Sequence, residues 1–178
     1  MIEIRKANIG DIEDIVNINI KVWKTAYKGI IDNSFLEERE KNRIDRIEKM
    51  KSEFEKIDYF YCVAVYKNKI VGIAKYGRLY EKEIYKLNNT GEIYALYILD
   101  EYQNKGAGKR LVYYALNELI NLKHYKKVLI WCLNDNNSIN FYLKIGGKPV
   151  LEKNKKIGNQ ILKETGFIFS GLENYIRK

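Results

Sequence analysis

The chain has 178 residues, of which 46% are hydrophobic and 31% are charged, and its 32 lysine and arginine residues outnumber 23 acidic residues to give a net charge of +9. This length is typical of one domain, so we expect residues 1–178 to form a single domain around one core. No stretch approaches the roughly 18 consecutive apolar residues of a membrane span, which argues against membrane insertion. The positive charge would attract phosphorylated ligands, acidic partners or nucleic acid, but an abundance of lysine, isoleucine and asparagine also indicates a general composition bias.

The N-terminus and the cysteines indicate the cellular setting. The first residues alternate apolar and charged side chains and lack the apolar block of a secretory signal, so we expect a cytoplasmic protein. Cys62 and Cys132 lie in separate apolar runs without paired spacing, which predicts buried, reduced thiols. His124 is the one histidine, which argues against a multi-histidine metal centre.

The N-terminal part of the chain predicts one strand followed by helices. Ile2 and Ile4 alternate with charged residues as in a short strand, and Asp11 is placed to cap a helix whose apolar residues recur at helical spacing. Gly29 ends this pattern. The charged run at residues 34–56 then predicts one helix or two with a solvated face.

From residue 59 the pattern changes to strands. Residues 59–66 and 70–79 are rich in aromatic and β-branched side chains and are joined by the short turn at 67–69, which predicts a β-hairpin. After a polar loop, the apolar run at 92–99 is typical of a strand buried on both faces and predicts the centre of the sheet.

The rest of the chain alternates helices and strands. The expected elements are a helix at 106–122, a buried strand at 128–133, a short helix at 136–145, and two strands near 149–152 and 160–169. The strand–helix order from 92 to 145 makes this part of the sheet parallel. The chain therefore predicts an α/β fold of the α+β kind, with a mixed central sheet of about six or seven strands flanked by about four helices.

Residues 103–110, with the sequence Gln-Asn-Lys-Gly-Ala-Gly-Lys-Arg, suit the binding of an anion. Gly106 and Gly108 allow a tight turn before a helix N-terminus, and together these features point N–H groups at a phosphate. The segment is not a P-loop, which requires glycine where Gln103 stands and serine or threonine where Arg110 stands. It also fails the dinucleotide-binding pattern, which needs a small residue in place of Leu111.

The pattern that does fit is Gln-x-x-Gly-x-Gly after a buried strand, and here the chain resembles the GCN5-related N-acetyltransferases, a superfamily of acyl-CoA-dependent N-acyltransferases. The similarity continues at family-like distances through Asn-Asp-Asn at 134–136, Phe-Tyr at 141–142 and Gly-Gly at 146–147. Residues 23–31 also resemble the opening of many bacterial members. The resemblance implies the acyl-CoA N-acyltransferase fold, acetyl-CoA as co-substrate with no metal, and acetyl transfer to a primary amine of a small molecule or peptide.

The resemblance also implies which residues bind coenzyme A. Gln103 leads the motif, and the backbone N–H groups that would bind the pyrophosphate belong to Asn104, Lys105, Gly106, Ala107, Gly108 and Lys109. Lys105, Lys109 and Arg110 would add positive charge, unless they are simply exposed at the helix end. The backbone of Leu96, Tyr97 and Ile98 would pair with the pantetheine arm, and an N–H group there would stabilise the oxyanion.

The sequence does not decide which of two asparagines contacts coenzyme A. The family's asparagine usually lies seven residues before the tyrosine, where this chain has Asp135 flanked by Asn134 and Asn136.

Transfer from a thioester to an amine needs a base and an acid. The resemblance implies that Tyr142 is the general acid toward the departing thiolate, although this tyrosine would otherwise only pack in the core. Glu92 is the candidate base, acting directly or through water; if its side chain faces away, water serves instead. Trp23 and Tyr27 are candidates for the acceptor-binding site.

Two other functions remain as alternatives. A non-catalytic sensor or regulatory module would bind acyl-CoA without transfer. A nucleic-acid-binding protein is disfavoured because the chain has no basic tail and no recognisable motif. A homodimer joined through the apolar residues 167–169 is a further open expectation.

Overall fold

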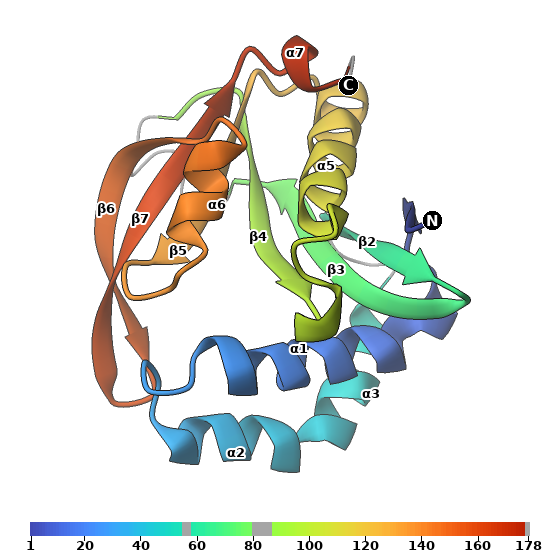
Figure 1. The fold of residues 1–178 in the computed structure, drawn as a ribbon, viewed down its shortest axis with the longest axis vertical. Coiled ribbons are helices and arrows are strands. Elements are labelled where there is room, and N and C mark those ends of the chain that lie inside the picture. Colours follow the sequence, from blue (N-terminus) through green and yellow to red (C-terminus); the bar gives the residue numbers. More distant parts are fainter. Residues whose placement is uncertain (55–57, 80–86, 177–178) are drawn as a thin grey trace.

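The computed structural model describes residues 1–54, 58–79 and 87–176, and within them a seven-stranded sheet carries helices on both faces (Figure 1). In chain order the main elements are β1 (Glu3–Lys6), α1 (Ile12–Ala26), α2 (Asn33–Lys41), α3 (Arg43–Glu53), β2 (Tyr59–Tyr66), β3 (Lys69–Arg78), β4 (Thr90–Ile98), α5 (Ala107–Lys123), β5 (Lys127–Leu133), α6 (Ile139–Lys144), β6 (Lys148–Ile157), β7 (Gln160–Ser170) and α7 (Glu173–Ile176). Short 3-10 turns precede α1 and follow β4.

The sheet is mixed, as its sequence pattern predicts. The strand order is β1-β2-β3-β4-β5-β7-β6, and every neighbouring pair is antiparallel except β4 and β5. The parallel pairing covers only Thr90–Ile93 of β4 against Lys127–Ile130 of β5, after which the two strands separate (Figure 1). The middle of the sheet therefore opens into a V.

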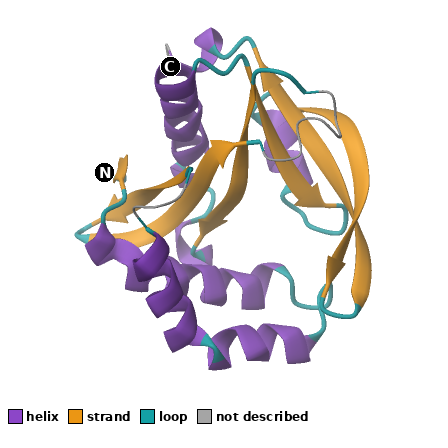
Figure 2. Cartoon of the chain, turned by 180° about the vertical axis from the view of Figure 1, so that it is seen from behind, coloured by secondary structure: helices purple, strands orange, loops and turns teal. Residues whose placement is uncertain are grey.

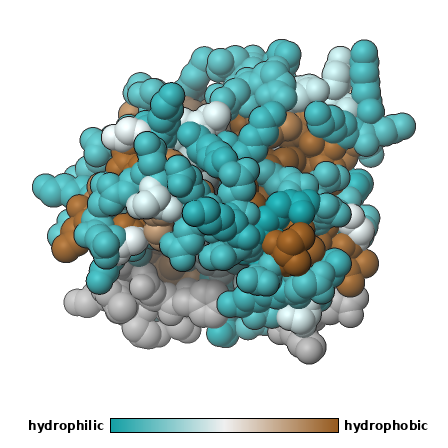
Figure 3. Space-filling view, turned by 90° about the horizontal axis from the view of Figure 1, so that it is seen from below, coloured by the Kyte–Doolittle hydropathy of each residue, from teal (hydrophilic) through white to brown (hydrophobic). Residues whose placement is uncertain are grey.

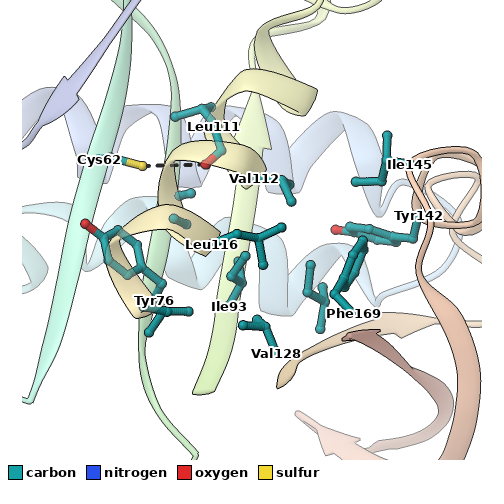
Figure 4. Close-up of a cluster of buried hydrophobic side chains, with 14 of the residues drawn as sticks. Cys62, Tyr76, Ile93, Leu111, Val112, Leu116, Val128, Tyr142, Ile145 and Phe169 are labelled. Atoms are coloured by element: carbon teal, nitrogen blue, oxygen red, sulfur yellow. Dashed lines mark hydrogen bonds between the residues drawn. The ribbon is translucent and has the colours of Figure 1, made fainter. Parts of the chain in front are cut away.

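Each face of the sheet is covered by its own helices. On one face, α5 buries Leu111, Val112 and Leu116 against strand residues such as Ile93 and Val128 (Figure 4). On the other face, α1 buries side chains against β2 and β3. Seen from behind, α1, α2 and α3 group at one end of the molecule (Figure 2). From that end the surface is mostly hydrophilic, with small separate apolar areas (Figure 3).

The structure differs in several details from the elements that the sequence predicts. The charged run at 34–56 forms two helices within its described part, α2 and α3. The strand β6 is much longer than the expected 149–152, because it is an edge strand whose exposed lysines give no alternating pattern, whereas β7 matches its expected range to within one residue. Phe167, Ile168 and Phe169 are buried in the core of this chain, so they present no surface for a dimer. None of the described helices is long and apolar enough to cross a membrane.

Asp11 does not cap α1 as expected. It holds the N-cap position but makes no side-chain capping bond to that helix. Its carboxylate instead accepts a hydrogen bond from the backbone N–H of Asn8 at 2.8 Å, and Arg5 donates to both of its oxygens at 2.7 and 2.8 Å. The Arg5 bonds are the main reason that the pKa of Asp11 lies below its ordinary value of 3.8.

We expect Asp11→Ala to lower the free energy of unfolding by about 1–2 kcal/mol at pH 7, because it removes one half of a capping box and a buried ion-pair partner. A group with a lowered folded-state pKa stabilises above its unfolded pKa and loses this contribution as pH falls through the folded value. Urea unfolding should therefore show the difference at pH 7 and a smaller one below about pH 4. Glu37→Ala, at an exposed position of α2, is the control. Equal losses at both pH values would contradict the role of the charge.

Candidate active site

A cavity of about 410 Å³ lies where β4 and β5 separate. Its wall comes from α1, β4, the loop before α5, α5, β5, the segment leading into α6, and α6 itself. The lining residues are Val22, Ala26, Tyr27, Ile93, Tyr94, Ala95, Leu96, Tyr97, Ile98, Gln103, Asn104, Gly106, Gly108, Lys109, Ile130, Trp131, Cys132, Asn136, Asn137, Ser138, Phe141 and Tyr142. Because β5 pairs with β4 only as far as Ile93, the β5-facing backbone edge of β4 beyond it is open to a ligand.

The N-terminus of α5 forms one end of this wall. Gly106 holds the N-cap position with a φ of 83°, a left-handed conformation that glycine adopts without strain. The first backbone bond of the helix runs from the Arg110 N–H to the Gly106 carbonyl at 3.1 Å, and no side chain caps this end. The preceding N–H groups, those of residues 107–109, thus have no acceptor within the helix and suit an anion.

Glycine also suits position 108, because a side chain there would be tight against its neighbours. A Cβ atom there would lie 3.3 Å from both Ile98 Cδ1 and Phe141 Cζ. The absence of a side chain lets the first turn of α5 approach β4 and α6 and leaves its backbone at the cavity.

The structure brings most of the predicted site residues to this cavity. Those on its wall are Tyr27, Leu96, Tyr97, Ile98, Gln103, Asn104, Gly106, Gly108, Lys109, Asn136 and Tyr142. The predicted residues that do not line it are Trp23, Glu92, Lys105, Ala107, Arg110 and Asn134.

Local contacts explain where these other side chains go. Lys105 Nζ donates to the Glu101 carbonyl at 2.7 Å, and the Arg110 guanidinium donates to the carbonyl of Ile2. Asn134 Oδ1 accepts a hydrogen bond from Thr165 Oγ1 at 2.8 Å, which directs Asn134 toward β7 and leaves Asn136 as the asparagine of the pair on the wall. Ala107 is buried in the core.

Glu92 is half-buried near the start of β4, opposite Gly77 of β3 and Leu129 of β5. It lies close enough to Lys75 for its charge to favour the protonated lysine, against the larger effect of burial, which lowers the pKa of Lys75.

Tyr142 enters the cavity from α6. Its side chain is 6% exposed, its ring packs 5.6 Å from that of Phe167, and its hydroxyl points away from α6 (Figure 4). Burial raises the pKa of Tyr142 well above its ordinary value, with the nearby Cys132 and Tyr97 adding to the effect. The hydroxyl therefore keeps its proton at neutral pH.

Aromatic side chains form the opposite end of the site, at α1. Trp23 Nε1 donates a hydrogen bond to Tyr97 Oη at 2.8 Å, and the Trp23 ring meets that of Tyr27 edge-on at 4.9 Å. Trp23 thus lies behind Tyr97 and Tyr27, which are on the wall itself.

Several wall residues carry no local signal in the sequence. Ala95 and Tyr94 reach the cavity at an irregularity in β4, where Lys75 pairs with Ala95 and Tyr76 with Ile93, so that Tyr94 is an extra residue. Trp131 lies on the wall because β5 leaves β4 after Ile130. The sequence feature that indicated this region was the predicted parallel order of β4 and β5.

Cys132 is a wall residue whose thiol should be unreactive. It is 6% exposed, and burial raises its pKa to about 12 from an ordinary 9.0. The thiolate fraction at pH 8 is then roughly a thousandfold below that of an open cysteine. We expect iodoacetamide to label Cys132 very slowly in the folded protein and rapidly in urea, as followed by mass spectrometry. Rapid labelling of the folded protein would contradict the burial.

Comparison with known proteins gives a family for this arrangement. A sequence model of the Acetyltransferase (GNAT) family matches residues 23–147, which include both the loop before α5 and Tyr142. A curated relative, the uncharacterized N-acetyltransferase YuaI of Bacillus subtilis, is 31% identical over 104 residues, covering 58% of this chain and 56% of YuaI. The aligned region thus spans just over half of that relative.

Solved structures share the fold at low sequence identity. A PaiA N-acetyltransferase from Thermoplasma acidophilum in complex with coenzyme A has a TM-score of 0.68 and 22% identity over 92% of this chain and 98% of its own. A chimera of the spermidine N-acetyltransferase SpeG from Vibrio cholerae has a TM-score of 0.72 and 14% identity over 99% of both chains. A ribosomal-protein-alanine N-acetyltransferase from Brucella melitensis has a TM-score of 0.67 and 18% identity over 94% and 99% of the two chains.

Proposed function

Because the chain belongs to the acetyltransferase (GNAT) family, a family of acetyl-CoA-dependent acyltransferases, we propose that it transfers an acetyl group from acetyl-CoA to a primary amine of a small molecule or peptide. The observation that carries the proposal is the single cavity wall that joins an uncapped helix N-terminus, an open strand edge and a buried, protonated tyrosine. These are an anion site, a partner for an extended amide chain and a proton donor.

Coenzyme A fits the donor groups at this wall. Its pyrophosphate would accept hydrogen bonds from the N–H groups at the start of α5, with Lys109 adding positive charge at the cavity. Its pantetheine amides would pair with the open edge of β4 at Leu96–Ile98, as an added strand does. A backbone N–H group of β4 would then stabilise the oxyanion that forms on the thioester carbonyl.

The reaction proceeds by direct attack. An alkylammonium first loses a proton, and we assign this step to Glu92 acting through water, since Glu92 itself does not line the cavity. The neutral amine attacks the thioester carbonyl and the C–N bond forms. The nitrogen then loses its second proton to solvent, and the C–S bond breaks. Tyr142 donates its proton to the departing thiolate and is reprotonated from solvent.

Calorimetric titration with acetyl-CoA and with free coenzyme A, together with thiol release across a panel of primary amines, tests this function. We expect micromolar binding of both and acetyl transfer to at least one amine. Binding without transfer to any amine would instead favour the acyl-CoA sensor. No binding would remove the proposal altogether.

A further inference from the structure

Two arginines lie near Trp23, outside the cavity wall, and have no acidic partner among the described residues. Arg39 of α2 stacks on Trp23, with its guanidinium carbon 3.6 Å from the ring centre. Its Nη2 donates to Asn19 Oδ1 at 2.6 Å, whereas its Nε is fully buried and has no hydrogen-bond partner among the described residues. Arg46 of α3 is half-buried and close enough to disfavour the charge on Arg39.

This arrangement has an unfavourable free energy in the absence of a bound anion. Burial, with Arg46 as the next cause, lowers the pKa of Arg39 to about 10, so the Arg39 guanidinium remains charged at neutral pH. Two half-buried like charges without a counter-charge are unfavourable, and a buried N–H group without an acceptor adds to the cost.

Two nearby cations, Arg43 of α3 and Lys24 of α1, do have acidic partners. Arg43 donates to Asn17 at 2.6 Å and also bonds Glu13, and Lys24 bonds Glu40. The carboxylates of Glu53 and Glu92 act instead on Lys75. Within the described residues, neither Arg39 nor Arg46 contacts a carboxylate, so this part of the chain supplies no counter-charge to the two guanidinium groups.

The contacts of Arg39 indicate where a bound anion would lie relative to the acceptor. Arg39 stacks on Trp23, and Trp23 bonds Tyr97 on the cavity wall. Tyr97 and Tyr27 are both near enough to affect the charge on Arg39. Arg39 itself does not line the cavity, so an anion at its guanidinium would lie beside Trp23, next to the α1 end of the cavity wall and away from the coenzyme loop before α5.

We propose that the acceptor is an amine that also carries a carboxylate, and that Arg39, supported by Arg46, binds this carboxylate while the amine faces the thioester. The inference rests on the proposed acetyltransferase function and names its substrate class. A guanidinium presents paired N–H groups that match a carboxylate, and a carboxylate would also supply the missing counter-charge. A polyamine would bring further positive charge to two unpaired arginines and is disfavoured.

The first test compares each of the common L-amino acids with its own carboxamide, and both with spermidine, by the rate of thiol release from acetyl-CoA. The carboxamide has the less basic amine, so simple reactivity at pH 7 favours the amide. We expect the reverse, a kcat/KM for the best acid about tenfold or more above that of its amide. Arg39→Gln should remove this preference through KM and leave the amide and acetyl-CoA nearly unaffected.

Arg43→Gln is the matched control, because Arg43 lies on the neighbouring helix with its own partners and should leave the preference intact. Equal or better use of the amide, a preference for spermidine, or an equal loss for acid and amide in Arg39→Gln would overturn the proposal.

A second measurement separates this inference from the acetyltransferase function. The Nε–H resonance of Arg39, identified by its loss in Arg39→Gln, should shift on titration with the amino acids in nitrogen-15 NMR spectra. A shift without transfer to any acceptor would retain the carboxylate site and remove the proposed function. No shift with any of these amino acids would overturn the carboxylate site, whether or not other amines are acetylated.

Discussion

Replacing Tyr142 with phenylalanine is expected to lower kcat by about tenfold or more and to leave the affinity for acetyl-CoA within about twofold. The change removes only the hydroxyl, and the ring keeps its packing against Phe167 and Phe141. Without a proton donor, the thiolate must leave unprotonated or take its proton from water, and the barrier to breaking the C–S bond rises.

Steady-state rates at saturating acetyl-CoA, with calorimetry for binding, separate these effects. Tyr113→Phe is the control, because Tyr113 lies on α5 outside the cavity wall and its ring contacts Tyr175. Because the pKa of Tyr142 is raised, the hydroxyl stays protonated through neutral and mildly alkaline pH, so the deficit should persist across that range. Unchanged turnover in Tyr142→Phe would remove this residue from the mechanism.

Replacing Gly108 with glutamate is expected to weaken binding of acetyl-CoA by about a hundredfold or more. The new side chain would place a negative charge beside the N–H groups at the start of α5, which the pyrophosphate would otherwise occupy. Its bulk would also press on Ile98 and Phe141, whose side-chain atoms lie 3.3 Å from the position of the added Cβ.

Gly108→Gln separates charge from size, since glutamine has nearly the same shape as glutamate. We expect it to bind acetyl-CoA more weakly than the unchanged protein and more tightly than Gly108→Glu, with calorimetry as the measurement. Circular dichroism of both variants establishes that they fold. Equal affinity of Gly108→Glu and the unchanged protein would show that the pyrophosphate binds elsewhere.

Local patterns in the sequence predict much of this fold. The turn at Lys67 and Asn68 joins β2 and β3 as expected, with both residues at positive φ. The glycine segment lies between β4 and α5, at the cavity, because the backbone freedom of Gly106 and the small size of Gly108 are properties of the residues themselves.

Features that depend on the packing of one helix or strand against another have no comparable signal in the local sequence. The separation of β4 from β5 follows from the pairing of distant segments, and so does the extra residue at Tyr94. The orientation of Arg110 toward the carbonyl of Ile2 joins residues far apart in the chain, and the sequence alone places this arginine at the coenzyme. Arg39 is likewise hidden in a charged run, where its position against Trp23 depends on the packing of α1 and α2.

The opening between β4 and β5 also bears on the energetics of the whole domain. The sheet is interrupted at its centre, so a coenzyme that binds there as we propose would act in part as a structural component that completes the sheet. A ligand that binds only the folded chain stabilises it by mass action, by about 2.7 kcal/mol at a hundred times its dissociation constant. The amount of folded protein and the protection of β4 from hydrogen exchange would then follow the supply of acetyl-CoA.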